Sequence, residues 1–436
     1  MINIILAGLL SIIVITVYSV ENRKRGLDLF SPYSVFLVMF FFYFPFKAFD
    51  IIFFGKYDEA TLTMALIYII IGLFSFFMGY YLKIGTMLGK MIKPMPDDLS
   101  RSKTLVISVI MAAFGVSLYF LILKMADFGG IIGAYTNMWR FRRIAFSQGM
   151  GYFTLMMHLF LNIPLTVWFI YLIKQEKSRK SVWLLFSFYL VMMSLILFSF
   201  GARGMVVGVF LSLIICYQYL KRSISFKYLA VIAVFLILLI GFATAFRGVA
   251  MGGISIGEVV TASAGLPAQE YLNILISRLD VLSFFMTILQ DFPTQGMDFQ
   301  YGRTLLNIFV QPIPRFLFQE KPCLIGDIFT QQFYPESVGW VSLDPSIFGE
   351  MYMNFHVAGI VIGLYLLGII CRLSQVYLEK NQKNRGVILF YAQIFGFPAS
   401  FLAAGFNSGA MISFVFCLVV VLAYLNLIRY REVKQA

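Results

Sequence analysis

Long apolar segments alternate with short polar ones along most of the chain. Many of these segments approach about twenty residues, the length that an α-helix needs to cross about 30 Å of hydrocarbon. The pattern predicts about eleven membrane-spanning helices, at residues 2–20, 33–54, 62–82, 104–123, 152–173, 182–200, 205–220, 228–246, 346–371, 387–404 and 409–428. We therefore expect an all-α polytopic membrane protein.

Composition agrees with this class. Of the 436 residues, 60% are apolar and only 13% are charged, whereas about a quarter of the residues of a soluble protein are charged. An ordinary soluble enzyme is therefore excluded. Charged residues at 21–25, rather than small ones, follow the first apolar segment, so we expect it to stay as a span and not to be cleaved as a signal peptide. The cysteines lack paired spacing, which predicts neither a disulfide framework nor a zinc site.

The short polar connections are rich in lysine and arginine. Together they hold 22 of the 34 basic residues, at 21–31, 83–103, 174–181, 221–227, 372–386 and 429–436. The positive-inside rule places these connections in the cytoplasm. Membrane topology thus explains the net charge of +13, and we expect no nucleic-acid partner.

Two connections on the opposite, outer side are too long to be simple turns, residues 124–151 and 247–345. The chain therefore divides into an N-terminal bundle of eight spans with the loop 124–151 (1–246), a large outer loop (247–345) and a C-terminal bundle of three spans (346–436). Apolar periodicity predicts amphipathic helices in the large loop at 268–290 and 303–310. Loops of this length usually carry function.

Arginine dominates the basic residues of the outer side. Three lysines stand there against eight arginines, Arg140, Arg142, Arg143, Arg203, Arg247, Arg278, Arg303 and Arg315. Topology signals do not distinguish lysine from arginine, but only the guanidinium offers a planar fork of donors that matches phosphate or carboxylate. The bias predicts an anionic ligand on the outer side. The alternative is that these arginines pair with the acidic residues of the same loops.

Two arginine sites favour the ligand interpretation. Residues 139–146, Trp-Arg-Phe-Arg-Arg-Ile-Ala-Phe, interleave bases with aromatic rings. A helix would put Arg140 and Arg143 on one face, whereas a strand would send Arg142 to the opposite face. Arg203 lies in Phe-Gly-Ala-Arg-Gly (200–204), where two spans join without a polar linker. An arginine at that depth is costly unless it is paired or faces a wet cavity.

Glu350 is the candidate general base. It lies within the apolar run that begins the ninth span, where an unpaired carboxylate is costly, so it either has an arginine partner or stays protonated. A structural ion pair is the alternative role. Asp344 precedes Pro345 and is well placed to cap this helix. No Walker loop, dinucleotide fingerprint or nucleophile elbow is present, and we expect neither a metal site nor a cofactor.

Three segments resemble the Wzy-type oligosaccharide repeat-unit polymerases, the family that builds O-antigen, capsule and enterobacterial common antigen. They are Phe-Gly-Ala-Arg-Gly at 200–204, Ile-Pro-Arg-Phe-Leu-Phe-Gln-Glu-Lys-Pro at 313–322, and residues 346–359 with Glu350 and Tyr-Met-Asn-Phe. Their order, the layout of the spans and the large late loop agree as well, so the resemblance covers most of the chain. His356 stands where the family pattern has glycine, which argues against a catalytic role for it.

The resemblance implies a GT-C-like membrane fold in the bacterial inner membrane, with its active site on the periplasmic side. It implies that a growing glycan passes from undecaprenyl pyrophosphate to the next lipid-linked unit. Under this hypothesis Arg203, as a catalytic residue, holds the donor pyrophosphate together with Arg140, Arg142 and Arg143. The acceptor pyrophosphate, or the loop itself, is held by Arg278, Arg303 and Arg315, and Glu350 assists deprotonation. The implied partners are the lipid-linked oligosaccharide, membrane lipids and a chain-length regulator protein.

Two other functions compete with this interpretation. An O-antigen ligase shares the fold and the donor but transfers the glycan to the lipid A core. A lipid-linked oligosaccharide flippase or transporter should carry arginines along an inner cavity, whereas here the spans are almost free of charge and the outer arginines gather on one face.

Overall fold

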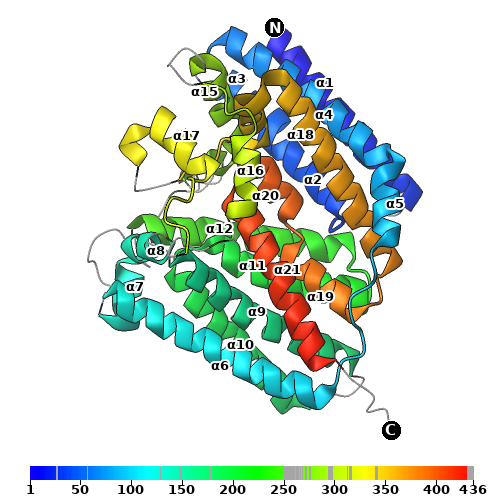
Figure 1. Cartoon of the computed structure of the whole chain (residues 1–436), viewed down its shortest axis with the longest axis vertical. Coiled ribbons are helices and arrows are strands. Elements are labelled where there is room, and N and C mark those ends of the chain that lie inside the picture. The colour runs from blue at the N-terminus through cyan, green and yellow to red at the C-terminus, as the bar shows by residue number, and fades with distance from the viewer. Residues whose placement is uncertain are drawn as a thin grey trace. The chain divides into compact units, whose positions relative to one another are not determined.

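The structure is a computed structural model of helices joined by turns and loops (Figure 1). It describes the whole chain except residues 26–27, 56, 128, 147–149, 176–178, 250–260, 262–264, 266, 268, 271–272, 274–275, 293–297, 312, 314–316, 339–341 and 430–436. Within the described part, eleven helices are long and apolar enough to cross a membrane. The predicted all-helical class and the number of spans are therefore confirmed.

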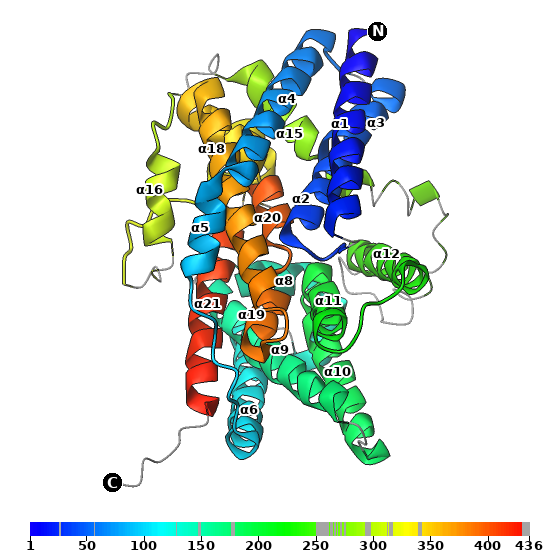
Figure 2. The ribbon, with the colours of Figure 1, turned by 90° about the vertical axis from the view of Figure 1, so that its right-hand side faces the viewer.

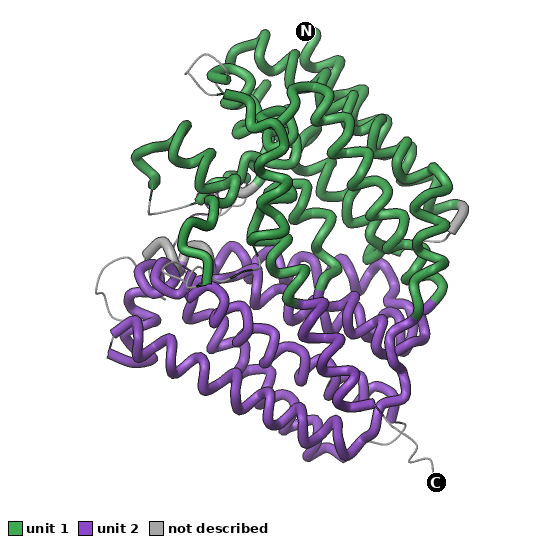
Figure 3. Tube along the Cα trace, viewed as in Figure 1, with its two compact units in different colours: residues 1–93, 276–380, 394–416 green, residues 94–275, 381–393, 417–436 purple. Residues whose placement is uncertain are grey.

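The chain forms two compact units, each assembled from several stretches of sequence (Figure 3). Unit 1 contains residues 1–93, 276–380 and 394–416, and unit 2 contains residues 94–275, 381–393 and 417–436. The predicted division into two bundles and a large outer loop concerns consecutive segments of the chain, and it stays a prediction.

Unit 1 contains the first spans, the large loop from residue 276 on and the ninth span. Its helices are α1 (Ile2–Arg25), α2 (Pro32–Phe41), η1 (Phe42–Phe46), α3 (Lys47–Phe54), α4 (Glu59–Tyr81), α5 (Lys83–Met91), η2 (Ser277–Leu279), α15 (Val281–Asp291), α16 (Arg303–Val310), α17 (Ile325–Phe333), η3 (Pro335–Ser337), α18 (Ser346–Lys380) and α20 (Phe397–Ala404).

Helices α4 and α18 form the closest pair in unit 1, and α5 continues along α18 (Figure 2). Gly79 of α4 lies against the backbone carbonyl of Tyr365, and Gly368 of α18 lies against the carbonyl of Phe76. A Cβ atom at either glycine would collide with backbone. Such contact through small residues is typical of helix pairs in membranes, where van der Waals packing drives association.

Helix α18 is broken at Phe355 (φ −144°, ψ 28°) and His356 (φ 54°, ψ −145°). The two segments on either side lie next to each other, because Gly359 packs against the carbonyl of Met351 and Gly363 against its side chain. The expectation of an uninterrupted helix over 346–371 was therefore wrong. The first segment includes Ser346, Glu350 and Asn354, and the strongly apolar run begins only at Val357, so this change in hydropathy was an available signal for the break.

Two other predicted spans also depart from a regular helix. The second is a continuous α2–η1–α3 helix with a π-helical turn that contains Pro45. The tenth consists of α19 (Arg385–Ile394) and α20, separated at Phe395 and Gly396. In the large loop, α16 matches the predicted amphipathic helix. The predicted helix over 268–290 overlaps α15 and the helical residues 269, 270, 273 and 276, and its positions 268, 271–272 and 274–275 lie outside the described residues. Helix α17 was not predicted.

Unit 2 packs around α9. Its helices are α6 (Arg101–Ala126), α7 (Gly130–Thr136), α8 (Met138–Phe146), α9 (Gly151–Lys174), α10 (Lys180–Ser199), α11 (Arg203–Leu220), α12 (Phe226–Val249), α19 and most of α21 (Gly409–Ile428). Helices α6, α10 and α11 all contact α9. The Asn162 amide on α9 donates to Gln393 Oε1 on α19 at 2.8 Å, which satisfies polar groups inside an apolar bundle.

Candidate functional site

Arg203 occupies the joint between two spans, as the sequence predicted. Helix α10 ends at Ser199, and Arg203 is the first residue of α11. Gly201 has φ +59°, a conformation that glycine adopts without strain. Phe200 is fully buried, whereas Arg203 is partly exposed. The joint is thus a tight turn that is anchored by one ring and carries one guanidinium.

The segment 139–146 is a helix, α8, which settles the choice between helix and strand. Arg140 and Arg143 are exposed and lie three residues apart, so they share a face. Arg142 is partly buried, with its guanidinium carbon 5.2 Å from the centre of the Phe146 ring. This distance is within the range of a cation–π contact.

Helix α8 packs onto the Arg203 joint through aromatic rings. The ring centroids of Phe141 and Phe200 are 4.8 Å apart and stacked, and Phe146 meets the same Phe200 ring edge-on at 6.4 Å. Within unit 2, therefore, the three arginines of α8 and Arg203 belong to two segments that share one buried ring. We call these four residues the arginine group.

The three arginines assigned to the acceptor are less completely described. Arg303 is exposed as the first residue of α16 and follows Gly302, which has φ +85°. Within the described residues, its guanidinium has no hydrogen bond or ion pair. Arg278 lies in η2, but its side chain is outside the described part. Arg315, like the side chain of Arg247, also lies outside it.

Glu350 is fully buried in unit 1, and its carboxylate is closed off by donors. Oε1 accepts a hydrogen bond from the Thr304 hydroxyl at 2.9 Å and from the Asn407 backbone N–H at 3.1 Å. Oε2 accepts from the backbone N–H of Phe406 at 2.5 Å. No arginine contacts Glu350 in the part of the chain that the structure describes. Three donors thus take the place of the expected arginine partner.

Asn354 extends this network. Its amide donates to Thr304 Oγ1 at 2.7 Å and to the Glu350 carbonyl at 2.8 Å, and it accepts from the Gly302 N–H at 2.9 Å. The network therefore joins α16, α18 and the α20–α21 connection. Asn407 is also fully buried, and neither polar atom of its side chain has a partner in the described structure.

Sequence reasoning assigned no role to Thr304, Asn354 or Asn407. Asn354 stands within the Tyr-Met-Asn-Phe motif, four residues after Glu350 and hence on the same helical face. That spacing was the available signal. Nothing in the local pattern could place residues 304 and 407 against residue 350, because these contacts span 46 and 57 residues of sequence.

The beginning of α18 corrects one prediction. Ser346 caps the helix by accepting a hydrogen bond from the Gly349 N–H at 3.2 Å, so Asp344 is not the cap. Burial raises the pKa of Asp344 to about 7, with further contributions from the negative charges of Asp327 and Glu350. Asp344 is therefore a group whose charge changes near neutral pH.

His356 is an aromatic packing residue at the break in α18. Its ring lies 4.5 Å from that of Tyr352 and 6.2–6.3 Å from those of Tyr68 and Phe299. Its φ of 54° with ψ of −145° is a conformation in which side chains are strained and glycine is favoured. A glycine, which the resemblance led us to expect at this position, would adopt this conformation without strain. In the described residues, no three His, Cys, Asp or Glu side chains are grouped as metal ligands, and the absence of a metal site stays a prediction.

A family model described as O-antigen polysaccharide polymerase Wzy matches residues 1–432. The chain belongs to this family. It is a multi-pass membrane polymerase of the bacterial inner membrane that joins lipid-linked oligosaccharide repeat units, a glycosyltransferase-type activity. No curated protein and no solved structure matches the chain.

Proposed function

We propose that the polymerase transfers the growing glycan from undecaprenyl pyrophosphate to the next lipid-linked repeat unit, on the periplasmic side of a GT-C-like fold. The observation that supports this most is the arginine group, in which α8 packs on Phe200 beside Arg203. The excess of arginine over lysine outside the predicted cytoplasmic connections supports the periplasmic assignment.

The reaction explains why guanidinium groups are needed. The acceptor hydroxyl oxygen forms a bond to the anomeric carbon of the donor sugar, and the bond from that carbon to the phosphate oxygen breaks. The lipid pyrophosphate leaves with the electron pair and gains negative charge. Arg203 and Arg140, Arg142 and Arg143 hold this leaving group, since fixed donors that face developing charge lower the barrier.

The acceptor's own pyrophosphate needs a second set of cations, which we assign to Arg278, Arg303 and Arg315. The exposed guanidinium of Arg303 at the beginning of α16 supports this assignment. A helix N-terminus also favours an anion through its free N–H groups and its dipole.

Glu350 assists removal of the proton from the acceptor hydroxyl in this proposal. Its carboxylate is covered by Thr304 and by the Phe406–Asn407 backbone, so that segment has to move away before a sugar hydroxyl can reach the oxygens. While these hydrogen bonds are formed, Glu350 positions Thr304 and, through it, the neighbouring Arg303. A chain-length regulator protein completes the proposed partners.

Replacing Arg203 with lysine in a deletion strain tests this function. Loss of one charged hydrogen bond to a transition-state phosphate costs about 3 kcal/mol, or roughly a hundredfold in rate. We expect R203K to be expressed normally and the surface glycan ladder to collapse to a single repeat. Arg222→Lys is the matched control, because Arg222 lies in the predicted cytoplasmic connection 221–227, where its guanidinium donates a hydrogen bond to the Tyr217 hydroxyl.

The pattern of glycan on the gel also separates a polymerase from both competing functions. Loss of a ligase leaves bare lipid A core, and loss of a transporter leaves the core without any repeat unit because none reaches the outer side. A normal ladder in the R203K strain would contradict the role assigned to Arg203.

A further inference from the structure

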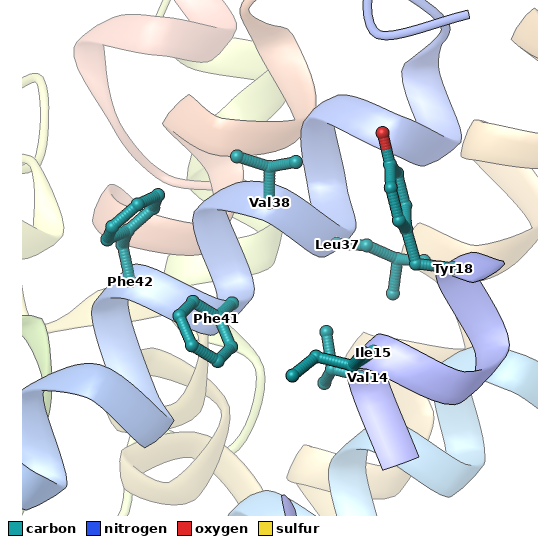
Figure 4. A pocket seen from close by; sticks show the side chains of 7 residues that line it. All are labelled: Val14, Ile15, Tyr18, Leu37, Val38, Phe41 and Phe42. Carbon is teal, nitrogen blue, oxygen red and sulfur yellow. The ribbon is translucent and has the colours of Figure 1, made fainter. Parts of the chain in front are cut away.

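A groove between α1 and α2 has no assigned role. It is lined by Val14, Ile15 and Tyr18 on one side and by Leu37, Val38, Phe41 and Phe42 on the other (Figure 4). Its volume is about 280 Å³, close to the lower end of the ~300–1,000 Å³ typical of small-molecule sites. We call it the α1–α2 groove.

The chemistry of the lining restricts the ligand to hydrocarbon. The Tyr18 hydroxyl is the single polar group among the seven side chains, and none of them is charged. A sugar or a pyrophosphate would lose its hydrogen bonds to water there without replacement. Ile15 and Phe42 are 54% and 40% exposed, so the groove opens at the surface of the spans.

The groove begins at the middle of two predicted spans and extends toward the predicted cytoplasmic connection 21–31. Val14 and Ile15 are within three residues of the centre of the first span (Ile2–Arg23), and Phe41 and Phe42 are within two of the centre of the second (Pro32–Phe54). At 1.5 Å per residue, these four residues lie within ~5 Å of the centre of each helix, whereas Tyr18 and Leu37 lie ~8–9 Å from it, toward the connection 21–31. A phospholipid tail of the outer leaflet ends near the bilayer centre, whereas a polyprenyl chain with an outer headgroup is longer than one leaflet and reaches past it.

The other face of the same helix connects the groove with the Glu350 network. Phe40 of α2 and Phe44 of η1, which do not line the groove, pack on Phe348, with ring centroids 6.5 and 4.9 Å apart. Phe348 stands two residues before Glu350 on α18. The groove is therefore separated from the Glu350 segment by one helix, within unit 1.

We propose that the α1–α2 groove binds the middle of the polyprenyl tail of the lipid-linked substrate. This inference rests on the proposed function, which supplies the polyprenyl carrier. Phe42 begins the π-helical turn, an irregularity common at functional sites, and it ends the groove with an aromatic wall. Lipid hydrocarbon is as apolar as the groove, so the shape of the groove and not exclusion of water selects the tail.

Photocrosslinking tests the proposal. The purified full-length polymerase in phospholipid vesicles is irradiated with an undecaprenyl diphosphate that carries a diazirine on a middle isoprene unit. We expect adducts on the peptides that contain residues 14–18 and 37–42. Val38→Trp, which fills the groove, should reduce these adducts at least fivefold. Ile12→Trp is the control, because Ile12 is 63% exposed on α1 and does not line the groove.

A functional measurement gives a second, independent result. V38W should raise the KM for a substrate with the full-length tail about fivefold and leave the KM for a short-tailed analogue unchanged, because only the long tail reaches the groove. Equal labelling of the groove by a phospholipid diazirine would show an ordinary lipid contact and overturn the proposal, as would adducts that lie elsewhere. If the wild type polymerises and R203K does not, such a result removes the groove assignment alone and leaves the proposed function intact.

Discussion

Truncation of Glu350 should destabilise the polymerase as well as inactivate it. The carboxylate accepts hydrogen bonds from the Thr304 hydroxyl and from two backbone N–H groups, at Phe406 and Asn407, in a fully buried site. Glu350→Ala removes the acceptor for all three donors. Leaving one buried donor unsatisfied costs about 1–3 kcal/mol. The hydroxyl can rotate away, so the two N–H groups set the expected loss at about 2–6 kcal/mol.

Glu350→Gln separates a positioning role from a purely chemical one. The amide keeps one acceptor oxygen, but its NH₂ group then faces at least one of the backbone donors, so we expect a loss of about 2–3 kcal/mol. A residue that acted only as a base would leave an inactive protein with wild-type stability. Because of the hydrogen bonds of the network, we expect E350Q to lose both polymer and thermal stability.

The assay for both variants is thermal unfolding of the detergent-purified protein, followed by size-exclusion fluorescence, next to the glycan ladder of the complemented strain. Glu379→Gln is the control, because Glu379 is exposed and the glutamine keeps the oxygen that accepts the hydrogen bond from Gln375 on the same helix. We expect E379Q to stay within about 0.5 kcal/mol of the wild type. Wild-type melting of E350A would refute the role of the network.

Substitutions at three further sites, with their controls, test other parts of the structure. His356→Gly should retain polymer and melt no lower than the wild type, because relief of strain at φ 54° offsets the lost ring contacts. His356→Val should melt at a lower temperature. The reverse order of the two melting temperatures would contradict the break in α18. Gly79→Ala should cost about 1–3 kcal/mol, since its Cβ would meet the Tyr365 carbonyl. The matched Gly8→Ala, in open space, should cost nothing, and equal melting temperatures would argue against the tight α4–α18 contact. For Asp344, the folded-state pKa of about 7 lies above the ordinary value. Protonated Asp344 therefore stabilises the folded protein fully below about pH 4, and this stabilisation is lost as the pH rises to about 7. Melting curves at pH 5 and 8 should therefore differ more for the wild type than for Asp344→Asn, and an equal difference would contradict the raised pKa.

Much of the fold could be predicted because it depends on local composition. Spans follow from apolar length, and α16 follows from the periodicity of residues 303–310. The break in α18 was missed because one span was predicted over 346–371, although residues 346–354 include Ser346, Glu350 and Asn354 and the strongly apolar run begins only at Val357. The glycine that the resemblance led us to expect at position 356, where this chain has a histidine with positive φ, was a second signal. Read as a backbone requirement, that position would have indicated a turn.

For the candidate site, too, the residue types could be predicted from the sequence but the contacts between distant residues could not. The residue types at 140–143 and 203 pointed to an anion, and aromatic packing then joined α8 to the Arg203 joint through Phe200. That contact joins residues about sixty positions apart, and no local pattern contains it. The Glu350 network also depends on distant partners, and a sequence cannot distinguish a carboxylate paired with arginine from one held by backbone N–H groups.

Binding of the lipid-linked donor to the purified polymerase tests the central claim most directly. The wild type, Arg203→Ala and the control Arg222→Ala would be placed in nanodiscs and titrated with undecaprenyl-pyrophosphate-linked repeat unit. We expect R203A to bind at least about tenfold more weakly, because a charged hydrogen bond to phosphate contributes about 1.5–3 kcal/mol. The affinity of R222A should not change. Equal affinity of all three proteins would contradict the assignment of the donor pyrophosphate to the arginine group.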